Sequence, residues 1–153
     1  PYRLQGNSKA GYGIFATRTI FKDEVIFPGE ETAQRIVTKQ YVEKNWSDEA
    51  KEVFRRYAYP ISNEVFLLWD NDPNGWAPQN HSCAPNTEYD GLNVNAIHDI
   101  QPGEELTLDY TTFLDENMEP FECRCGHPEC RGLIKGTPGN SITNIAIRKC
   151  NQL

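Results

Sequence analysis

The apolar residues of this chain fall in short runs separated by turn residues, a pattern that predicts short β-strands. Near the start, Gly11-Tyr12-Gly13 is typical of a tight turn. An apolar stretch begins after it at Ile14-Phe15-Ala16 and resumes at Val25-Ile26-Phe27. The first part of the chain is therefore expected to be rich in β-hairpins.

The middle of the chain continues this pattern with one strongly apolar segment. Val65-Phe66-Leu67-Leu68-Trp69 is a continuous apolar run, which is typical of a strand buried on both faces. The polar and turn-forming residues 70–75 then predict a loop. Further strands are expected at 92–97 and 105–108, with a turn at 101–104 between them.

Only one region shows helical spacing. Ser47 is a suitable N-cap, and apolar residues then recur at i, i+3, i+4 and i+7, namely at Ala50, Val53, Phe54 and Tyr57. A shorter helix from about Lys39 to Lys44 is expected after Thr38. With a helical insert at about 38–59 and strands elsewhere, the predicted fold is mostly β with a helical insert, an α+β class.

Length and composition indicate one small globular domain. The 153 residues suffice to bury roughly two thirds of the unfolded surface in one core. Hydrophobic residues make up 38% of the chain, mean hydropathy is -0.66, and no apolar run approaches the length of a membrane span. We therefore expect a soluble protein that does not bind membranes.

The charge of the chain favours a cationic partner. The net charge is -7, which disfavours direct nucleic-acid binding, because that contact depends on Lys and Arg neutralising phosphates. An acidic surface instead raises the local concentration of a basic peptide. The alternative is that the acidity only keeps the domain soluble.

The cysteine spacing indicates a metal site. Cys123, Cys125 and Cys130 form a Cys-x-Cys-x4-Cys pattern, and zinc takes four soft ligands in a tetrahedron. The fourth ligand must be Cys83 or Cys150, and we favour Cys83 because chain ends are commonly frayed. The alternative is two disulfides with one thiol left over. A zinc site would place the protein in a reducing intracellular compartment.

Four separated motifs resemble one family. They are Gly11-Tyr12-Gly13, then Asn80-His81-Ser82-Cys83-x-Pro85-Asn86, then Gly103-Glu104-Glu105-Leu106-Thr107-Leu108-Asp109-Tyr110, and the three later cysteines. In order and spacing this resembles the SET-domain protein lysine methyltransferases with a cysteine-rich post-SET tail. The resemblance implies a knot-like β-clip SET domain at 1–115, a post-SET zinc motif at 120–136 and an unassigned extension at 137–153. Its fourth zinc ligand is again Cys83.

The resemblance also implies an activity and a set of site residues. S-adenosylmethionine would donate a methyl group to a lysine of a protein or peptide, with histone tails as possible substrates and the nucleus as the location in a eukaryote. Tyr110 would be the catalytic residue, with Leu108 beside it in the substrate channel. The donor would be bound by Gly11, Tyr12, Gly13, Phe66, Asn80, His81 and Leu133. The oligomeric state is not predicted.

Three departures from the family pattern affect these expectations. Phe66 stands where many members have a tyrosine, which removes a hydroxyl near the methyl group, and Ala77-Pro78 replaces an Arg-Phe pair. Leu108 stands where Phe or Tyr is usual, and its lack of a hydroxyl favours di- or trimethylation. The alternative function is a non-catalytic SET-like binding or scaffold module.

Overall fold

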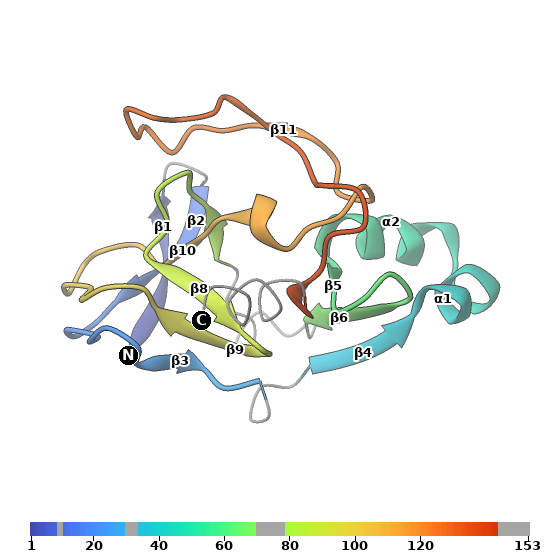
Figure 1. The fold of residues 1–153 in the computed structure, drawn as a ribbon, viewed down its shortest axis with the longest axis horizontal. Helices are drawn as coiled ribbons and strands as arrows, with labels where there is room; N and C mark the ends of the chain where they lie inside the picture. The colour runs from blue at the N-terminus through green and yellow to red at the C-terminus, as the bar shows by residue number, and fades with distance from the viewer. Residues whose placement is uncertain (9–10, 30–33, 70–78, 144–153) are drawn as a thin grey trace, which may run out of the picture.

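The computed structural model describes residues 1–8, 11–29, 34–69 and 79–143. Over these ranges the protein is mostly β with two α-helices, which confirms the predicted fold class (Figure 1). The described strands form five small sheets of two or three strands each. The predicted loop at 70–75 and the Ala77-Pro78 pair lie outside the described residues.

An antiparallel hairpin opens the fold, formed by β1 (Tyr2–Ser8) and β2 (Gly11–Ala16). The Gly-x-Gly motif predicted as a tight turn lies instead at the start of β2, where Gly13 pairs with Gln5. Gly11 has a φ of 100°, a conformation that glycine adopts without steric penalty, and the register of the hairpin shifts beside it. The motif therefore begins a strand while keeping the backbone irregular.

A three-stranded sheet carries much of the main hydrophobic core. Its order is β3 (Val25–Phe27), β9 (Asn93–Ala96) and β8 (Thr87–Asp90), so the predicted strand at 92–97 is confirmed as the central one. Buried residues from this sheet, from β2 and from later segments form one cluster, whose largest fully buried members are Ile14, Ile20, Tyr89, Ile100, Leu106, Phe113 and Ile142. Leu106 and Leu108, from the segment that leads to Tyr110, belong to this cluster.

A second three-stranded sheet contains the predicted buried strand. Its order is β4 (Gln34–Thr38), β6 (Val65–Trp69) and β5 (Tyr59–Pro60), with β6 in the centre and both pairings antiparallel. The side chains of Phe66, Leu67 and Leu68 are all buried, as expected of a strand covered on both faces.

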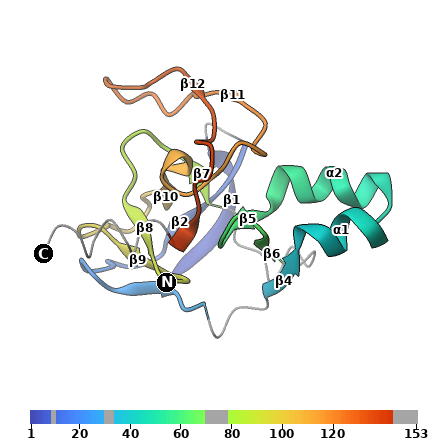
Figure 2. The same cartoon turned by 45° about the vertical axis from the view of Figure 1, so that its right-hand side comes forward.

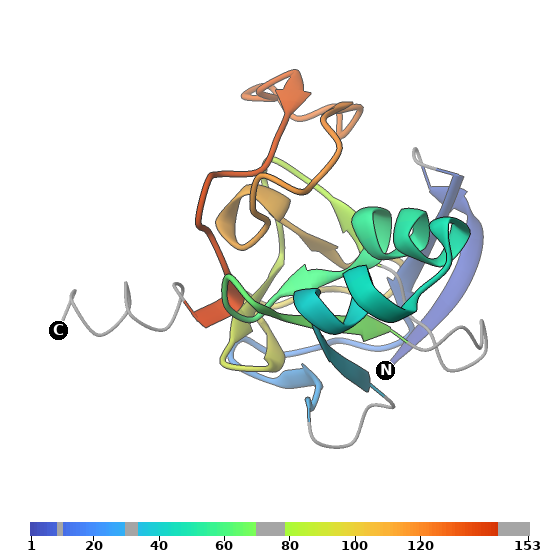
Figure 3. The ribbon, with the colours of Figure 1, turned by 90° about the vertical axis from the view of Figure 1, so that its right-hand side faces the viewer.

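Both predicted helices are present beside this sheet. They are α1 (Lys39–Asn45) and α2 (Asp48–Tyr57), and they lie together on one flank of the molecule (Figures 2 and 3). Thr38 and Ser47 cap them by accepting hydrogen bonds from the main-chain N–H groups of Tyr41 and Ala50. Phe54 of α2 packs against the sheet. Neither described helix is long and apolar enough to cross a membrane.

Two very short strands join the middle of the chain to its later part. β7 (Asn80–His81) and β10 (Thr107–Leu108) pair in parallel, with Asn80 opposite Thr107 and His81 opposite Leu108. A 3-10 turn at Tyr110–Thr112 follows directly. The pairing places the central motif beside the segment that contains Tyr110.

The three later cysteines lie in a separate lobe of the tail. β11 (Phe121–Glu122) pairs antiparallel with β12 (Leu133–Ile134), and the segment between them stands above the body of the molecule in Figures 1 and 3. This lobe corresponds to the stretch at 120–136 that was predicted as a zinc motif.

After this lobe the chain returns to the main core. Gly136 passes so close to Asp115 that a Cβ atom at position 136 would lie 1.7 Å from the Asp115 carbonyl oxygen. Further along, the Asn140 side chain donates a 2.9 Å hydrogen bond to the Thr111 carbonyl. Ile142 is 1% exposed and belongs to the main core. Residues 136–143 are therefore packed against the body of the domain.

Candidate active site and metal centre

The pairing of β7 with β10 fixes Tyr110 at both ends of the residue. Its main-chain N–H donates to His81 Nδ1 at 3.1 Å, and its hydroxyl donates to the main-chain carbonyl of Gln79 at 2.5 Å. One step before, the Ser82 N–H donates to the Leu108 carbonyl at 2.9 Å. Because a hydrogen-bonded phenol has few ways to turn, the ring and the hydroxyl of Tyr110 are held in a single orientation.

Polar side chains extend this short parallel ladder. The Asn86 side chain bonds the main chain twice, donating to the Glu105 carbonyl at 2.8 Å and accepting from the Thr107 N–H at 2.9 Å. Gln79 donates to the Thr87 hydroxyl at 2.8 Å, and Thr87 donates to the Thr107 carbonyl at 2.7 Å. Gln79 and Thr87 are buried, so each satisfied bond avoids a desolvation penalty.

Asn80 connects the first motif to the central motif. Its side-chain amide nitrogen donates to the Tyr12 carbonyl at 2.6 Å and to Glu105 Oε1 at 2.8 Å. The two amide protons therefore hold the Gly-x-Gly strand against the site. Within that strand Gly13 is buried, whereas the Tyr12 side chain is 69% exposed.

A cluster of buried aromatic rings surrounds Tyr110. The Tyr59 ring centroid lies 6.4 Å from that of Tyr110 and 5.0 Å from that of Phe113, and Tyr89 lies 5.0 Å from Phe113. Among the described residues the Tyr89 hydroxyl has no hydrogen-bond partner. The sequence analysis did not identify Tyr59 or Tyr89, because they come from strands far from residue 110 and no local spacing links them.

Burial keeps these phenols protonated. It raises the pKa of Tyr89 and of Tyr110 well above 10, and it raises the pKa of Tyr59 to about 12 against a partial opposing effect of the hydrogen bond with Tyr110. Tyr110 is therefore a neutral hydroxyl near neutral pH, suited to orienting a reactant and unsuited to removing a proton from it.

Three predicted site residues occupy different surroundings. Phe66 is 1% exposed and packs on Phe54 with ring centroids 5.0 Å apart, in the core cluster on the helical side of the molecule. Leu108 is 2% exposed and lies in the main core. Leu133 is 60% exposed on β12 of the tail. The structure thus brings Asn80, His81 and Tyr110 together and places Phe66 elsewhere.

A cavity of about 430 Å³ opens beside Tyr110. Its walls come from three separate segments: Asn80, His81 and Ser82 of the central motif, Glu105, Thr107 and Tyr110 of the following strand region, and residues 121–125 of the tail. Its volume falls in the range typical of small-molecule sites, about 300 to 1,000 Å³. The arrangement is suited to a ligand enclosed between the body of the domain and the cysteine lobe.

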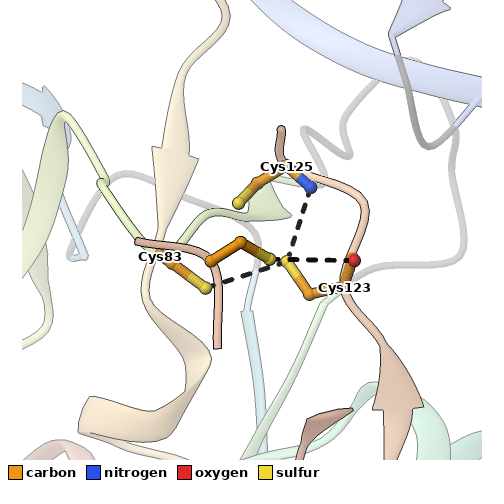
Figure 4. Close-up of side chains that lie close together, drawn as sticks. Cys83, Cys123 and Cys125 are labelled. Carbon is orange, nitrogen blue, oxygen red and sulfur yellow. Dashed lines mark hydrogen bonds between the residues drawn. The ribbon is translucent and has the colours of Figure 1, made fainter. Parts of the chain in front are cut away.

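The four predicted cysteines form one group, with sulfur atoms all within 4.8 Å of one another. Cys83, Cys123 and Cys125 point toward one another in Figure 4, and the sulfurs of Cys83 and Cys123 are 3.8 Å apart. A tetrahedron of thiolates around zinc has edges of about 3.8 Å, whereas a disulfide needs about 2.05 Å. All four are free thiols, so the alternative of disulfides among them is wrong. Cys150 lies outside the described residues.

The surroundings of the cysteine sulfurs favour the thiolate form, which binds metal ions, at Cys125 but not at Cys123. Burial raises the pKa of Cys123 to about 12. Burial alone would also raise the pKa of Cys125, but hydrogen bonds with the main chain at Cys83 and His127 and with neighbouring thiols bring it down to about 6. Main-chain N–H groups of Cys125 and Arg131 also donate to the sulfurs of Cys123 and Cys83 at 3.4 Å. A divalent cation would stabilise the remaining thiolates.

His81 lies between the cysteine group and Tyr110. Its Nδ1 accepts the Tyr110 N–H, which assigns the ring proton to Nε2, and Nε2 lies 3.5 Å from Cys83 Sγ. Burial lowers the pKa of His81, although nearby Asp109 opposes the shift, so the ring is neutral. On the outer side Arg131 pairs with Asp109 at 2.8 Å, and that hydrogen bond raises the Arg131 pKa further.

Comparison with known proteins places this geometry in context. Residues 11–111 match the SET domain family. The chain is 29% identical over 93% of its length to the variant-silencing SET domain-containing protein of Plasmodium falciparum. It is 33% identical over 80% of its length to the H3 lysine-4 specific histone-lysine N-methyltransferase of Schizosaccharomyces pombe, and 30% identical over 90% to the histone-lysine N-methyltransferase Set2 of Drosophila melanogaster. It spans 6%, 14% and 6% of these three proteins, respectively.

The buried tyrosines predict a loss of stability at alkaline pH. Their pKa values are higher in the folded protein than the ordinary value of 10, so the stability they contribute is complete below pH 10 and is lost as the pH rises toward about 12, the value for Tyr59. Urea unfolding between about pH 9 and 11.5 should show a falling midpoint, with tyrosinate absorbance rising as the protein unfolds. Tyr59→Phe should weaken this dependence. A midpoint that stays constant over that range would contradict the account.

Proposed function

Because this chain belongs to the SET-domain family, we propose that it is a protein-lysine N-methyltransferase that uses S-adenosylmethionine. The observation that carries the proposal is the convergence at one cavity of Asn80 and His81, the buried hydroxyl residue Tyr110 and the cysteine lobe. The names of the relatives, two of which are histone-lysine N-methyltransferases, agree with it.

The residues around the cavity suit the methyl donor. S-adenosylmethionine supplies an electrophilic methyl group on a positively charged sulfur. Glu105 contributes negative charge to the wall, and Asn80 holds both Glu105 and the Gly-x-Gly strand in place. We assign the donor to this cavity, with Gly11 and Gly13 allowing close approach of the main chain and the exposed Leu133 available to contact the adenine.

The tyrosine cluster suits the acceptor amine. A free lysine has a pKa of about 10.4, so its deprotonation at pH 7 costs about 4.6 kcal/mol, and apolar surroundings lower that cost by disfavouring the charged form. The hydroxyl proton of Tyr110 is engaged by the Gln79 carbonyl, and its oxygen, which also takes part in the hydrogen bond with Tyr59, keeps one lone pair to orient the amine. We assign Tyr110 a catalytic role through positioning rather than proton removal, because methyl transfer depends on alignment of the reacting atoms.

We assign zinc to the cysteine group. Cys83, Cys123, Cys125 and Cys130 offer four thiolates and no oxygen ligand, a set that favours zinc over calcium or magnesium. Four protein ligands leave no open position, so the metal would be structural. Its role would be to hold the lobe, and with it residues 121–125 of the cavity wall, in place.

For the substrate we propose a basic protein segment such as a histone tail. The chain has a net charge of -7, which attracts cationic peptides and repels nucleic acid. Two of the relatives are named for methyl transfer to histone lysine. A histone substrate would place the protein in the nucleus of a eukaryote.

The alternative is a SET-like module that binds without turnover. It is motivated by Phe66, which lacks the hydroxyl that many members have at that position, and by Ala77, which lies outside the described residues. Phe66 lies in the helix-side cluster, however, and Tyr59 brings a hydroxyl into contact with Tyr110 from a neighbouring strand. This arrangement favours a methyltransferase over a module that only binds.

Replacing Tyr110 by Phe should abolish most methyl transfer while leaving the fold intact. The substitution removes the hydroxyl that orients the amine, and with it the hydrogen bond to Gln79. Loss of one such oriented polar group typically lowers turnover by about 100-fold or more. The measurement is transfer of a radiolabelled methyl group to unfractionated histones.

The matched control is Tyr41→Phe, since Tyr41 is 54% exposed on α1 and far from the cavity in sequence and in the fold. Its activity should equal that of the parent. Donor binding without any methyl transfer by the parent protein would support the binding-module alternative, and label incorporation that survives Tyr110→Phe would refute the assignment of Tyr110.

The product should carry two or three methyl groups. Leu108 has no hydroxyl to restrain a methylated amine, which leaves it free to rotate for a further transfer. Mass spectrometry of a time course on unfractionated histones measures the outcome. A product that stops at one methyl group would contradict this prediction and would point to the Tyr89 hydroxyl as the restraint. Tyr89→Phe should in that case increase the number of methyl groups.

Loss of the metal should open the donor cavity. Cys130→Ser should reduce bound zinc from one ion per chain to near zero, and the affinity for S-adenosylmethionine should fall about tenfold or more because the cysteine lobe forms part of the wall. Elemental analysis and calorimetry measure the two effects, with Cys150→Ser as the control that keeps the metal. Metal removal that leaves the donor affinity unchanged would separate the metal from the cavity.

A further inference from the structure

We propose that Arg131 is a positioning residue, which fixes Tyr110 by clamping the residues on either side of it to the cysteine lobe. The inference rests on the proposed function for its catalytic consequence and on the contacts of the Arg131 side chain and main chain for its geometry. The sequence analysis placed Arg131 within the stretch at 120–136 but assigned it no role.

The guanidinium group of Arg131 bonds both neighbours of Tyr110. Its Nη2 lies 2.8 Å from Asp109 Oδ2, and its Nη1 donates to Thr111 Oγ1 at 2.9 Å. Thr111 in turn donates from its hydroxyl to Asp109 Oδ1 at 2.7 Å and from its main-chain N–H to the same oxygen at 3.0 Å. The three side chains form a closed ring of hydrogen bonds around the backbone of residue 110.

The main chain of Arg131 reaches the cysteine group. It directly follows Cys130, and its N–H donates to Cys83 Sγ at 3.4 Å. From the same sulfur a second route leads through His81 to the Tyr110 N–H. His81 therefore bonds Tyr110 directly on its buried side, and Arg131 bonds the two neighbours of Tyr110 on its exposed side. Both His81 and Arg131 also contact the sulfur of Cys83.

This placement assigns Arg131 a role in alignment rather than in overall stability. Its side chain is 42% exposed, and an ion pair so open to water adds little to the free energy of unfolding. Its planar group nevertheless fixes two partners at once, which a lysine cannot reproduce. A small displacement of a positioning group can lower turnover strongly, because the reacting atoms must be collinear.

The test compares Arg131→Gln and Arg131→Lys with Arg18→Gln. Arg18 is the matched control, because it forms a similarly exposed pair with Glu24, outside the cavity and the cysteine group. At saturating S-adenosylmethionine, Arg131→Gln should lower turnover on unfractionated histones about ten- to a hundredfold. Arg131→Lys should recover part of the loss, and Arg18→Gln should match the parent.

Two further measurements separate alignment from collapse of the tail. Zinc content and donor affinity should stay at parental values in Arg131→Gln. The amide hydrogen of Tyr110 should exchange with solvent about tenfold faster, whereas amides of β6 should not change. Thr111→Val should reproduce part of the turnover loss, and combining it with Arg131→Gln should add little, since both break the same ring.

The outcomes are distinct. Unchanged turnover in Arg131→Gln, unchanged exchange of the Tyr110 amide, or zinc loss that accompanies the fall in turnover would each overturn the proposal. If the parent transfers no methyl group, the proposed function has failed, and the exchange measurement alone decides whether Arg131 holds Tyr110.

Discussion

The whole site depends on a parallel pairing only two residues long. β7 and β10 meet at Asn80 and His81 opposite Thr107 and Leu108, and the hydrogen bonds of Tyr110 to Gln79 and His81 are made at or next to that pairing. So short a ladder would be marginal alone. The Asn86 side chain strengthens the pairing, because its amide forms two further hydrogen bonds with the main chain, at Glu105 and Thr107. The central motif therefore stabilises the pairing of β7 with β10 in addition to lining the cavity.

His81 divides two environments with opposite electrostatic character. Its Nε2 faces the thiol of Cys83, and its Nδ1 faces the main chain of Tyr110, with Asp109 3.7 Å away. The imidazole is 2% exposed and bonds to each side through a different ring nitrogen. Because the ring between the cysteines and the tyrosine cluster is neutral, it adds no charge to the tyrosine cluster, where a charge would be poorly solvated.

Local patterns predicted those parts of the structure that local chemistry determines. The two helices follow from capping by Thr38 and Ser47, and β6 follows from its unbroken apolar run. The cysteine group followed from ligand chemistry. Tyr59 and Tyr89 could not be found in this way, because Tyr59 meets Tyr89 and Tyr110 only after two different sheets pack together. The neighbours of Phe66 could not be found locally for a related reason, since both faces of β6 are buried and its sequence does not show which of them packs on Phe54.

The position of Ile142 has a consequence for how the polypeptide is made. A ribosome releases the chain from its amino end, yet the innermost cluster includes a side chain near the far end of the described residues, beside Ile14 and Ile20. The early hairpin therefore emerges long before its last packing partner has been synthesised. Because domains fold as units, the early hairpin cannot complete its packing until residue 142 has left the ribosome.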